Sequence, residues 1–213
     1  MKPVFSLGLM AAGALALTGC FDDDNKDSAA SRFLKDHQGQ YSAAYEQDGH
    51  AAQLRLALTS KAAVLMLISD RDELTAYSGR YADNALTFSN GAVCELDTDA
   101  SCTLDAVTLT LSAEALTAPD LQDAAADYAS AGNQTLSLSV AGEADIALDG
   151  CTLTVTLVAE DSGLLRAEQA GDCGRSAVQG VAYEAGDGHD ISALQLVLPG
   201  SDVSGYWTRT SGE

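Results

Sequence analysis

The chain has 213 residues, of which 31 are Asp or Glu and only 11 are Lys or Arg, so its formal net charge at pH 7 is −20. A chain this acidic is repelled by nucleic acid and by anionic lipid, which argues against both as partners. We therefore expect cationic partners or none. The length suits one domain, or two small ones, with a substantial hydrophobic core.

Residues 1–19 have the organisation of a bacterial export signal. Lys2 supplies the positive end, and an almost wholly apolar run extends from Val4 to Leu17. This run is shorter than the ~20 residues that a transmembrane helix needs, so an export signal is the better interpretation.

The segment closes with Leu17-Thr18-Gly19-Cys20, which resembles the lipobox of bacterial lipoproteins. The resemblance implies a diacylglycerol on the Cys20 thiol, cleavage before Cys20, and an acyl chain such as palmitate on the new N-terminus. In that family an Asp directly after the cysteine retains the protein in the inner membrane. Phe21 stands there in this chain, so the resemblance implies anchoring in the outer membrane. An ordinary secretory signal that happens to end in Cys is the alternative.

Residues 20–38 are predicted to form an acidic tether and a short helix. Phe21–Asp27 is highly charged and is interpreted as a spacer that keeps the body clear of the membrane. A surface-export signal is the alternative for this run. We expect the helix over Ser28–Gln38, with Asp27 as its N-cap and Gly39 at its end.

Apolar and polar residues alternate through much of residues 39–112, which predicts short antiparallel strands. Leucine occupies every second position from Leu54 to Leu58, the pattern of a half-buried strand. Ala63–Ser69 is instead a nearly continuous apolar run and predicts a more deeply buried strand. A turn is expected at Gln47–His50, and Asn90-Gly91 is the strongest hairpin signal in the chain.

The alternation stops at residues 113–133, where we expect a short helix. Pro119 suits its first turn and Gly132 its end, and apolar residues recur with helical spacing from Leu121 to Tyr128.

Strands resume at Leu136 and continue to Arg209. The predicted fold class is mostly β: an antiparallel barrel or sandwich of about a dozen short strands, with one N-terminal and one mid-chain helix. We assign residues 39–213 to one β-rich domain.

Four cysteines remain besides Cys20, and an even number in an oxidising compartment predicts two disulfides. A turn-like triplet lies midway between Cys94 and Cys102, and another midway between Cys151 and Cys173. Hairpins at these turns would bring each pair together, so we expect Cys94–Cys102 and Cys151–Cys173. A metal site is the alternative, but the chain has no C-x-x-C and no His at ligand spacing from these cysteines.

The first candidate binding motif is Ser78-Gly79-Arg80-Tyr81. It is similar to the Ser-Gly-x-x-Tyr element of periplasmic lysozyme inhibitors of the small β-barrel lipoprotein type, although it is one residue shorter and the domain here is longer. The resemblance implies that Ser78 and Tyr81 bind a cationic lysozyme, which the acidity of this chain would favour. A strand end with a packed Tyr81 is the alternative.

The second candidate is Gly205-Tyr206-Trp207, which holds the only tryptophan. With other tyrosines, Tyr206 and Trp207 could line a site for a sugar or an apolar ligand, because aromatic rings combine apolar faces with polar edges. Packing in the core is the alternative role. The tyrosines considered with this pair are Tyr41, Tyr45, Tyr77 and Tyr81.

Sequence signatures of common enzyme classes are missing, with no G-x-S-x-G, H-E-x-x-H, P-loop or G-x-G-x-x-G. His189 lies between Asp187 and Asp190, a group that could bind a metal or act as a base; a polar loop is the alternative. We therefore expect no catalytic residues and no cofactor or metal.

These patterns favour a non-enzymatic binding or interaction lipoprotein, anchored in the outer membrane through Cys20. The expected partner is a cationic protein, a glycan or a small apolar ligand. The alternatives are a defence protein like the lysozyme inhibitors and a metal-dependent hydrolase built around His189.

Overall fold

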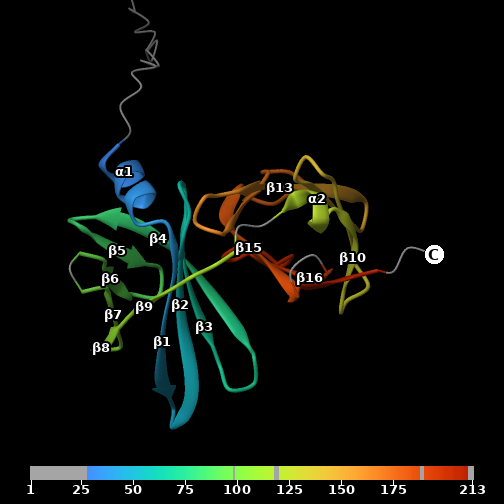
Figure 1. The fold of residues 1–213 in the computed structure, drawn as a ribbon. Helices are drawn as coiled ribbons and strands as arrows, with labels where there is room; N and C mark the ends of the chain where they lie inside the picture. The colour runs from blue at the N-terminus through green and yellow to red at the C-terminus, as the bar shows by residue number, and fades with distance from the viewer. Residues whose placement is uncertain (1–27, 98, 118–119, 188–189, 211–213) are drawn as a thin grey trace, which may run out of the picture.

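The computed structural model describes residues 28–97, 99–117, 120–187 and 190–210 (Figure 1). The export signal, the lipobox and the acidic run after Cys20 lie outside these residues. The described chain is mostly antiparallel β-structure in two sheets, with two short helices and two disulfides, as the sequence predicted. It contains seventeen strands, more than the dozen expected.

The first sheet, which we call the N-terminal sheet, follows helix α1 (Ala29–Asp36) and contains nine strands. The strands are β1 (Gly39–Gln47), β2 (His50–Leu58), β3 (Ala63–Ile68), β4 (Leu74–Ala82), β5 (Ala85–Phe88), β6 (Val93–Glu95), β7 (Ser101–Leu104), β8 (Val107–Thr110) and β9 (Ser112–Glu114).

Strands β1 to β8 are neighbours in chain order, and β9 pairs with the free edge of β1. Only Leu111 separates β8 from β9, so one continuous segment pairs with β7 at one edge of the sheet and with β1 at the other. This change of partner curls the sheet into a barrel-like form. Its core includes Leu56, Leu65 and Phe88, with Phe33 of α1 packed against it.

The second sheet is a closed barrel, which we call the C-terminal barrel, preceded by helix α2 (Leu121–Ala124). Its eight strands are β10 (Ala126–Ser130), β11 (Thr135–Leu138), β12 (Glu143–Leu148), β13 (Cys151–Ala159), β14 (Leu165–Gln169), β15 (Val178–Asp187), β16 (Asp190–Val197) and β17 (Gly205–Arg209).

The barrel strands follow one another in chain order, and β17 closes the ring on β10. The alternation of apolar and polar residues along the strands explains how the barrel interior is filled. On β13, Leu153, Val155 and Leu157 all point into the core, while the intervening threonines face outward.

Two helix predictions need correction. Helix α1 is N-capped by Ser28, whose Oγ accepts a hydrogen bond from the Ser31 amide at 3.1 Å, rather than by Asp27. The mid-chain helix is a single turn that ends at Ala124, and the predicted helical residues beyond it form β10. Tyr128 therefore lies on a strand, where its side chain is fully buried in the barrel core. Tertiary burial outweighs helical spacing at this position.

Both predicted disulfides are confirmed. Cys94 and Cys102 face each other directly on β6 and β7, and both are buried. Cys151 begins β13, while Cys173 lies in the loop after β14, at the position opposite Cys151 if the β13–β14 register continued past its last pair.

The two halves pack wall against wall through a second apolar layer. Val64 and Met66 of β3 contact the outer faces of β15 and β16, where Val181 and Val197 lie. Strand β3 is therefore buried on both faces, which explains its nearly continuous apolar sequence and confirms the prediction of a deeply buried strand.

A buried polar cluster joins the same two halves. The Glu160 carboxylate accepts hydrogen bonds from the backbone amide and hydroxyl of Ser60, at 2.8 and 2.6 Å, across the interface. Arg166 donates to Glu160 at 2.8 Å and also pairs with Glu168, which in turn contacts Lys61 at 3.2 Å. The side chains of Glu160 and Arg166 are only 6% and 11% exposed, so the cluster fixes one orientation of the halves.

Candidate ligand-binding sites

The first candidate site is a cavity of about 670 Å³ at the end of the N-terminal sheet that lies away from α1. We call it the mouth. Its walls come from the end of β1, from β3, and from the hairpin that joins β7 to β8. Small-molecule sites usually measure ~300–1,000 Å³ and often lie in barrel mouths, so both size and position suit a ligand.

The floor of the mouth is apolar. Leu67, Leu104 and Leu109 line it and also pack against the N-terminal core. Val107 stands at the edge with 57% of its surface exposed, one of only three large apolar residues so exposed in the described part of the chain. An apolar surface continuous with the core is therefore open to solvent here.

The rim of the mouth is acidic. Three exposed carboxylates, those of Glu46, Asp48 and Asp105, lie around the opening. Burial raises the pKa of the Tyr45 hydroxyl, and the nearby Tyr77 and the charge of Asp105 raise it further. Tyr45 therefore stays protonated, and its hydroxyl lies close enough to feel the Asp105 charge.

Two of these carboxylates are positioned by the backbone conformation of the hairpin turns in which they lie. Asp48 and Asp105 have φ values of 52° and 48°, in the left-handed region that tight hairpins require. Asp and Asn tolerate this region better than most residues, so the local sequence both closes the hairpins and places charge at the opening.

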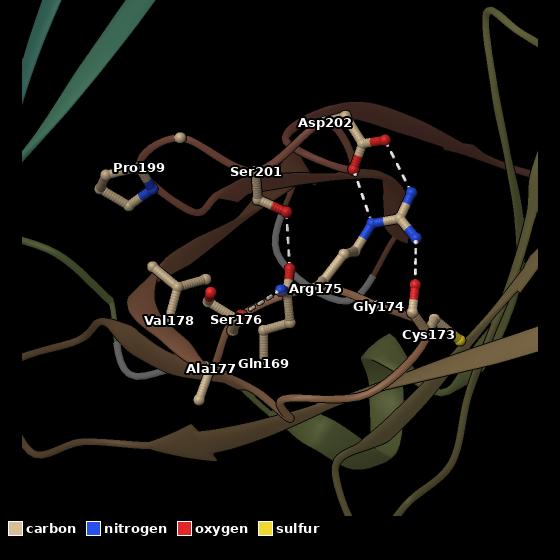
Figure 2. Close-up of a pocket in the computed structure, with 11 residues that line it drawn as sticks. Gln169, Cys173, Gly174, Arg175, Ser176, Ala177, Val178, Pro199, Ser201 and Asp202 are labelled. Carbon is tan, nitrogen blue, oxygen red and sulfur yellow. Dashed lines mark hydrogen bonds and ion pairs between the residues drawn. The ribbon is translucent and has the colours of Figure 1, made fainter.

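The second candidate site is a groove of about 540 Å³ on the C-terminal barrel, between the β14–β15 and β16–β17 loops (Figure 2). Gln169 lies at its centre. The side chain donates to the backbone oxygen of Ser176 at 2.9 Å and accepts from the Ser201 hydroxyl at 2.6 Å. These bonds tie the two loops together.

The charges of the groove already have partners. Arg175 binds both carboxylate oxygens of Asp202, at 2.9 and 2.7 Å, and also reaches the backbone oxygen of Cys173 (Figure 2). The hydrogen bond from Arg175 lowers the pKa of Asp202. A bidentate pair of this kind fixes loop geometry and leaves little charge for a ligand.

The interior of the C-terminal barrel is filled by side chains. Trp207 is 1% exposed and its indole nitrogen donates to the Val203 oxygen at 3.3 Å. Tyr128 is equally buried and donates to the Ala124 oxygen. Trp207 thus has the packing role that was the alternative for it.

The structure does not bring the predicted binding residues together as pairs. Ser78 is exposed on the outer face of β4, whereas Tyr81 turns inward, where its ring stacks on Phe33 with centroids 4.3 Å apart. Tyr206 is 58% exposed, on the opposite face of β17 from Trp207. Ser78 and Tyr81 belong to the N-terminal sheet, whereas Tyr206 and Trp207 belong to the C-terminal barrel, so the two pairs lie in different halves of the molecule.

The four tyrosines that were considered together with Tyr206 and Trp207 do gather in the N-terminal core, as an aromatic site would need, but Trp207 is not among them. They are Tyr41, Tyr45, Tyr77 and Tyr81. Only Tyr45 reaches the mouth. Gly79 has a packing explanation, because a Cβ there would lie 2.5 Å from the Phe88 ring.

His189 lies outside the described residues, and the side chains of Asp187 and Asp190 are not described either. In the described ranges, no three His, Cys, Asp or Glu side chains are grouped so as to hold a metal ion. Over the same residues, no helix has the length and apolar composition needed to cross a bilayer.

Sequence reasoning missed the mouth. Its floor combines Leu67 of β3 with Leu104 and Leu109 of the β7–β8 hairpin, which lies far from β3 in the chain, and each of these leucines is ordinary by itself. Comparison of the chain with protein-family models, with curated proteins and with solved structures finds no match.

Proposed function

We propose that this protein is a lipid-anchored binding module of the bacterial outer membrane, without enzymatic activity, that holds a ligand in the mouth of its N-terminal sheet. The observation that carries the proposal is the mouth itself: an apolar floor, continuous with the core and open to solvent, inside an acidic rim. Solvent-exposed apolar surface of this kind is characteristic of binding sites.

The proposed location in the outer membrane rests on the lipobox-like Leu17-Thr18-Gly19-Cys20 and on Phe21 after it. Acyl chains on Cys20 would hold the protein stably, since each buried methylene contributes ~0.8 kcal/mol. Two disulfides fit an oxidising compartment. The acidic tether would leave the mouth accessible to a cationic protein, a glycan or a small apolar ligand.

Fewer observations support the two alternative functions, a lysozyme inhibitor and a hydrolase. A site like that of the lysozyme inhibitors would use Ser78 and Tyr81, which face opposite sides of β4. A hydrolase around His189 has no described geometry to support it.

The test is native mass spectrometry of the full-length protein, expressed in its own host and released gently from the membranes. We expect acyl chains on Cys20 and an added mass from a bound ligand. Cys20→Ser should abolish membrane retention. Val107→Lys, which places a charged chain at the edge of the mouth, should abolish the added mass.

Val140→Lys is the matched control, because Val140 is a similarly exposed valine, at 66%, on the C-terminal barrel. It should leave the ligand bound. An acylated protein with no added mass, or one whose ligand survives Val107→Lys, would contradict the proposed site. Absence of acyl chains would contradict the anchor.

A further inference from the structure

We infer that the ligand of the mouth is a small molecule with an apolar body and one cationic group, such as an alkylammonium. This inference rests on the proposed function and adds to it the chemical class of the ligand.

The charge of the rim selects the cation. Every ionisable carboxylate that lines the mouth belongs to Glu46, Asp48 or Asp105, and no lining residue is Lys, Arg or His. A cation bound at the opening would interact favourably with all three carboxylates, whereas an anion would be repelled by them. In the groove of the C-terminal barrel, by contrast, Arg175 already neutralises Asp202.

The floor selects the apolar body. Leu67, Leu104 and Leu109 offer no hydrogen-bonding side chain, so a sugar ring inserted there would lose hydrogen bonds to water without replacing them. An alkyl chain or an aliphatic ring gains from the same surface.

Tyr45 adds to the recognition of a cation. It lines the mouth, and its hydroxyl donates to the Gln47 side chain at 3.1 Å. An aromatic ring attracts quaternary ammonium groups through its negative face, and nearby carboxylates strengthen that attraction. Tyr45, Asp48 and Asp105 are therefore the residues that we expect to contact the cationic group.

The experiment uses three soluble probes with the same alkyl chain: octyltrimethylammonium, 1-octanol and octyl sulfate. Binding to the mature protein is measured by calorimetry and by NMR shifts. Octyltrimethylammonium should bind about tenfold more tightly than 1-octanol at low salt, and octyl sulfate more weakly than either. The preference should shrink as salt rises, because rim charges are screened.

The decisive variant is Asp48→Asn with Asp105→Asn. Both positions have left-handed φ values, which Asn also adopts readily, so the change removes charge without backbone strain. It should reduce the affinity for octyltrimethylammonium about fivefold and leave the affinity for 1-octanol unchanged. Asp83→Asn is the matched control, because Asp83 has φ 52° in the β4–β5 turn, which does not line the mouth, and it should change neither affinity.

Equal binding of octyltrimethylammonium and 1-octanol would overturn the inference and leave the proposed binding function standing. An equal loss with Asp83→Asn would also overturn it, because the attraction would then come from the acidity of the whole chain. Failure of all three probes would overturn the inference, and the mass spectrum of the native protein would then decide the proposed function separately.

Discussion

The two halves of the molecule begin in the same way. Each starts with a short helix, α1 or α2, followed within three residues by a strand. In each, a tyrosine on that first strand donates a hydrogen bond to the carbonyl four residues earlier: Tyr41 to His37 and Tyr128 to Ala124. The helix therefore covers one end of its sheet in both halves.

The halves differ in how they are completed. In the C-terminal barrel, β17 closes the ring, and the ring is filled by Trp207 and Tyr128. In the N-terminal sheet, the final segment is divided between two edges, and the end away from α1 is lined by leucines that remain partly open. Similar antiparallel walls thus enclose a filled core in one half and a core with a cavity at one end in the other, depending on the side chains that face the interior.

The sharpest way to test this comparison is to remove one interior side chain from each half. Trp207→Ala should lower the free energy of unfolding by about 3–5 kcal/mol, because it leaves a large cavity in a closed core. Leu109→Ala should cost only about 1–2 kcal/mol, because Leu109 lines a cavity that is open at the surface and is only partly buried. Urea denaturation followed by circular dichroism measures both. Equal losses would mean that the mouth is packed as tightly as the barrel.

The disulfides test a second difference between the halves. In the chain-entropy model, the separation of 22 residues between Cys151 and Cys173 gives about 3.4 kcal/mol, and the separation of 8 between Cys94 and Cys102 about 2.5 kcal/mol. Both sulfurs of the shorter bridge are fully buried, however, and each adds ~1 kcal/mol of apolar burial.

Replacing Cys94 and Cys102 by Ala should therefore cost about 4.5 kcal/mol, more than the same change at Cys151 and Cys173. Urea denaturation of the two double variants without reductant checks this order. If the bridge with the longer loop cost more, loop entropy rather than burial would dominate, and the N-terminal core would be looser than its burial indicates.

The interface between the halves supplies the next prediction. Arg166→Ala leaves the buried Glu160 carboxylate with only its Ser60 hydrogen bonds and should cost about 3 kcal/mol. Arg166→Met combined with Glu160→Gln should be far milder, because no unpaired charge remains. Calorimetry should show one transition in the native protein and two separated transitions in Arg166→Ala. A single, unshifted transition in Arg166→Ala would show that the apolar layer alone couples the halves.

Local patterns in the sequence predicted much of this fold. The leucines at every second position from Leu54 to Leu58 and the Asn90-Gly91 turn each depend on near neighbours. The structure confirms both, because the three leucines are buried and β5 pairs with β6 across the turn. The prediction of a helix reaching Tyr128 was wrong, because the apolar residues there have helical spacing but lie in the core of a barrel. Local preference was the weaker influence there.

The mouth was beyond sequence reasoning for a related reason. Leu67 and Leu109 resemble any other inward-facing leucine until the closure of each sheet is known. Asp105 likewise resembled an ordinary turn residue, because nothing in the sequence shows that the β7–β8 turn borders an opening. The predicted pairs, by contrast, have odd sequence spacings, and odd spacing on a strand puts two side chains on opposite faces.

The smallest predicted effect concerns the helix ends, where the halves differ in charge. Burial, and to a lesser extent the charges of Asp120 and Asp123 at α2, together raise the pKa of Glu184 on β15 to about 7. The unfolded chain releases this proton near pH 4.5, while the folded protein keeps it until about pH 7. The contribution of Glu184 to stability is therefore greatest below pH 4.5 and is lost as pH rises to 7.

Glu184→Gln should consequently stabilise the protein at pH 8 and change little at pH 4.5. The gain should be about 1 kcal/mol, less than the pKa shift alone suggests, because the carboxyl group is only half buried and solvent screens it. Glu95→Gln, at an exposed position on the wall of the N-terminal sheet, is the control and should move neither value. Thermal unfolding of both variants across this pH range measures the effect. A gain from Glu184→Gln that is the same at pH 4.5 and pH 8 would mean that packing, not proton release beside α2, limits the C-terminal barrel.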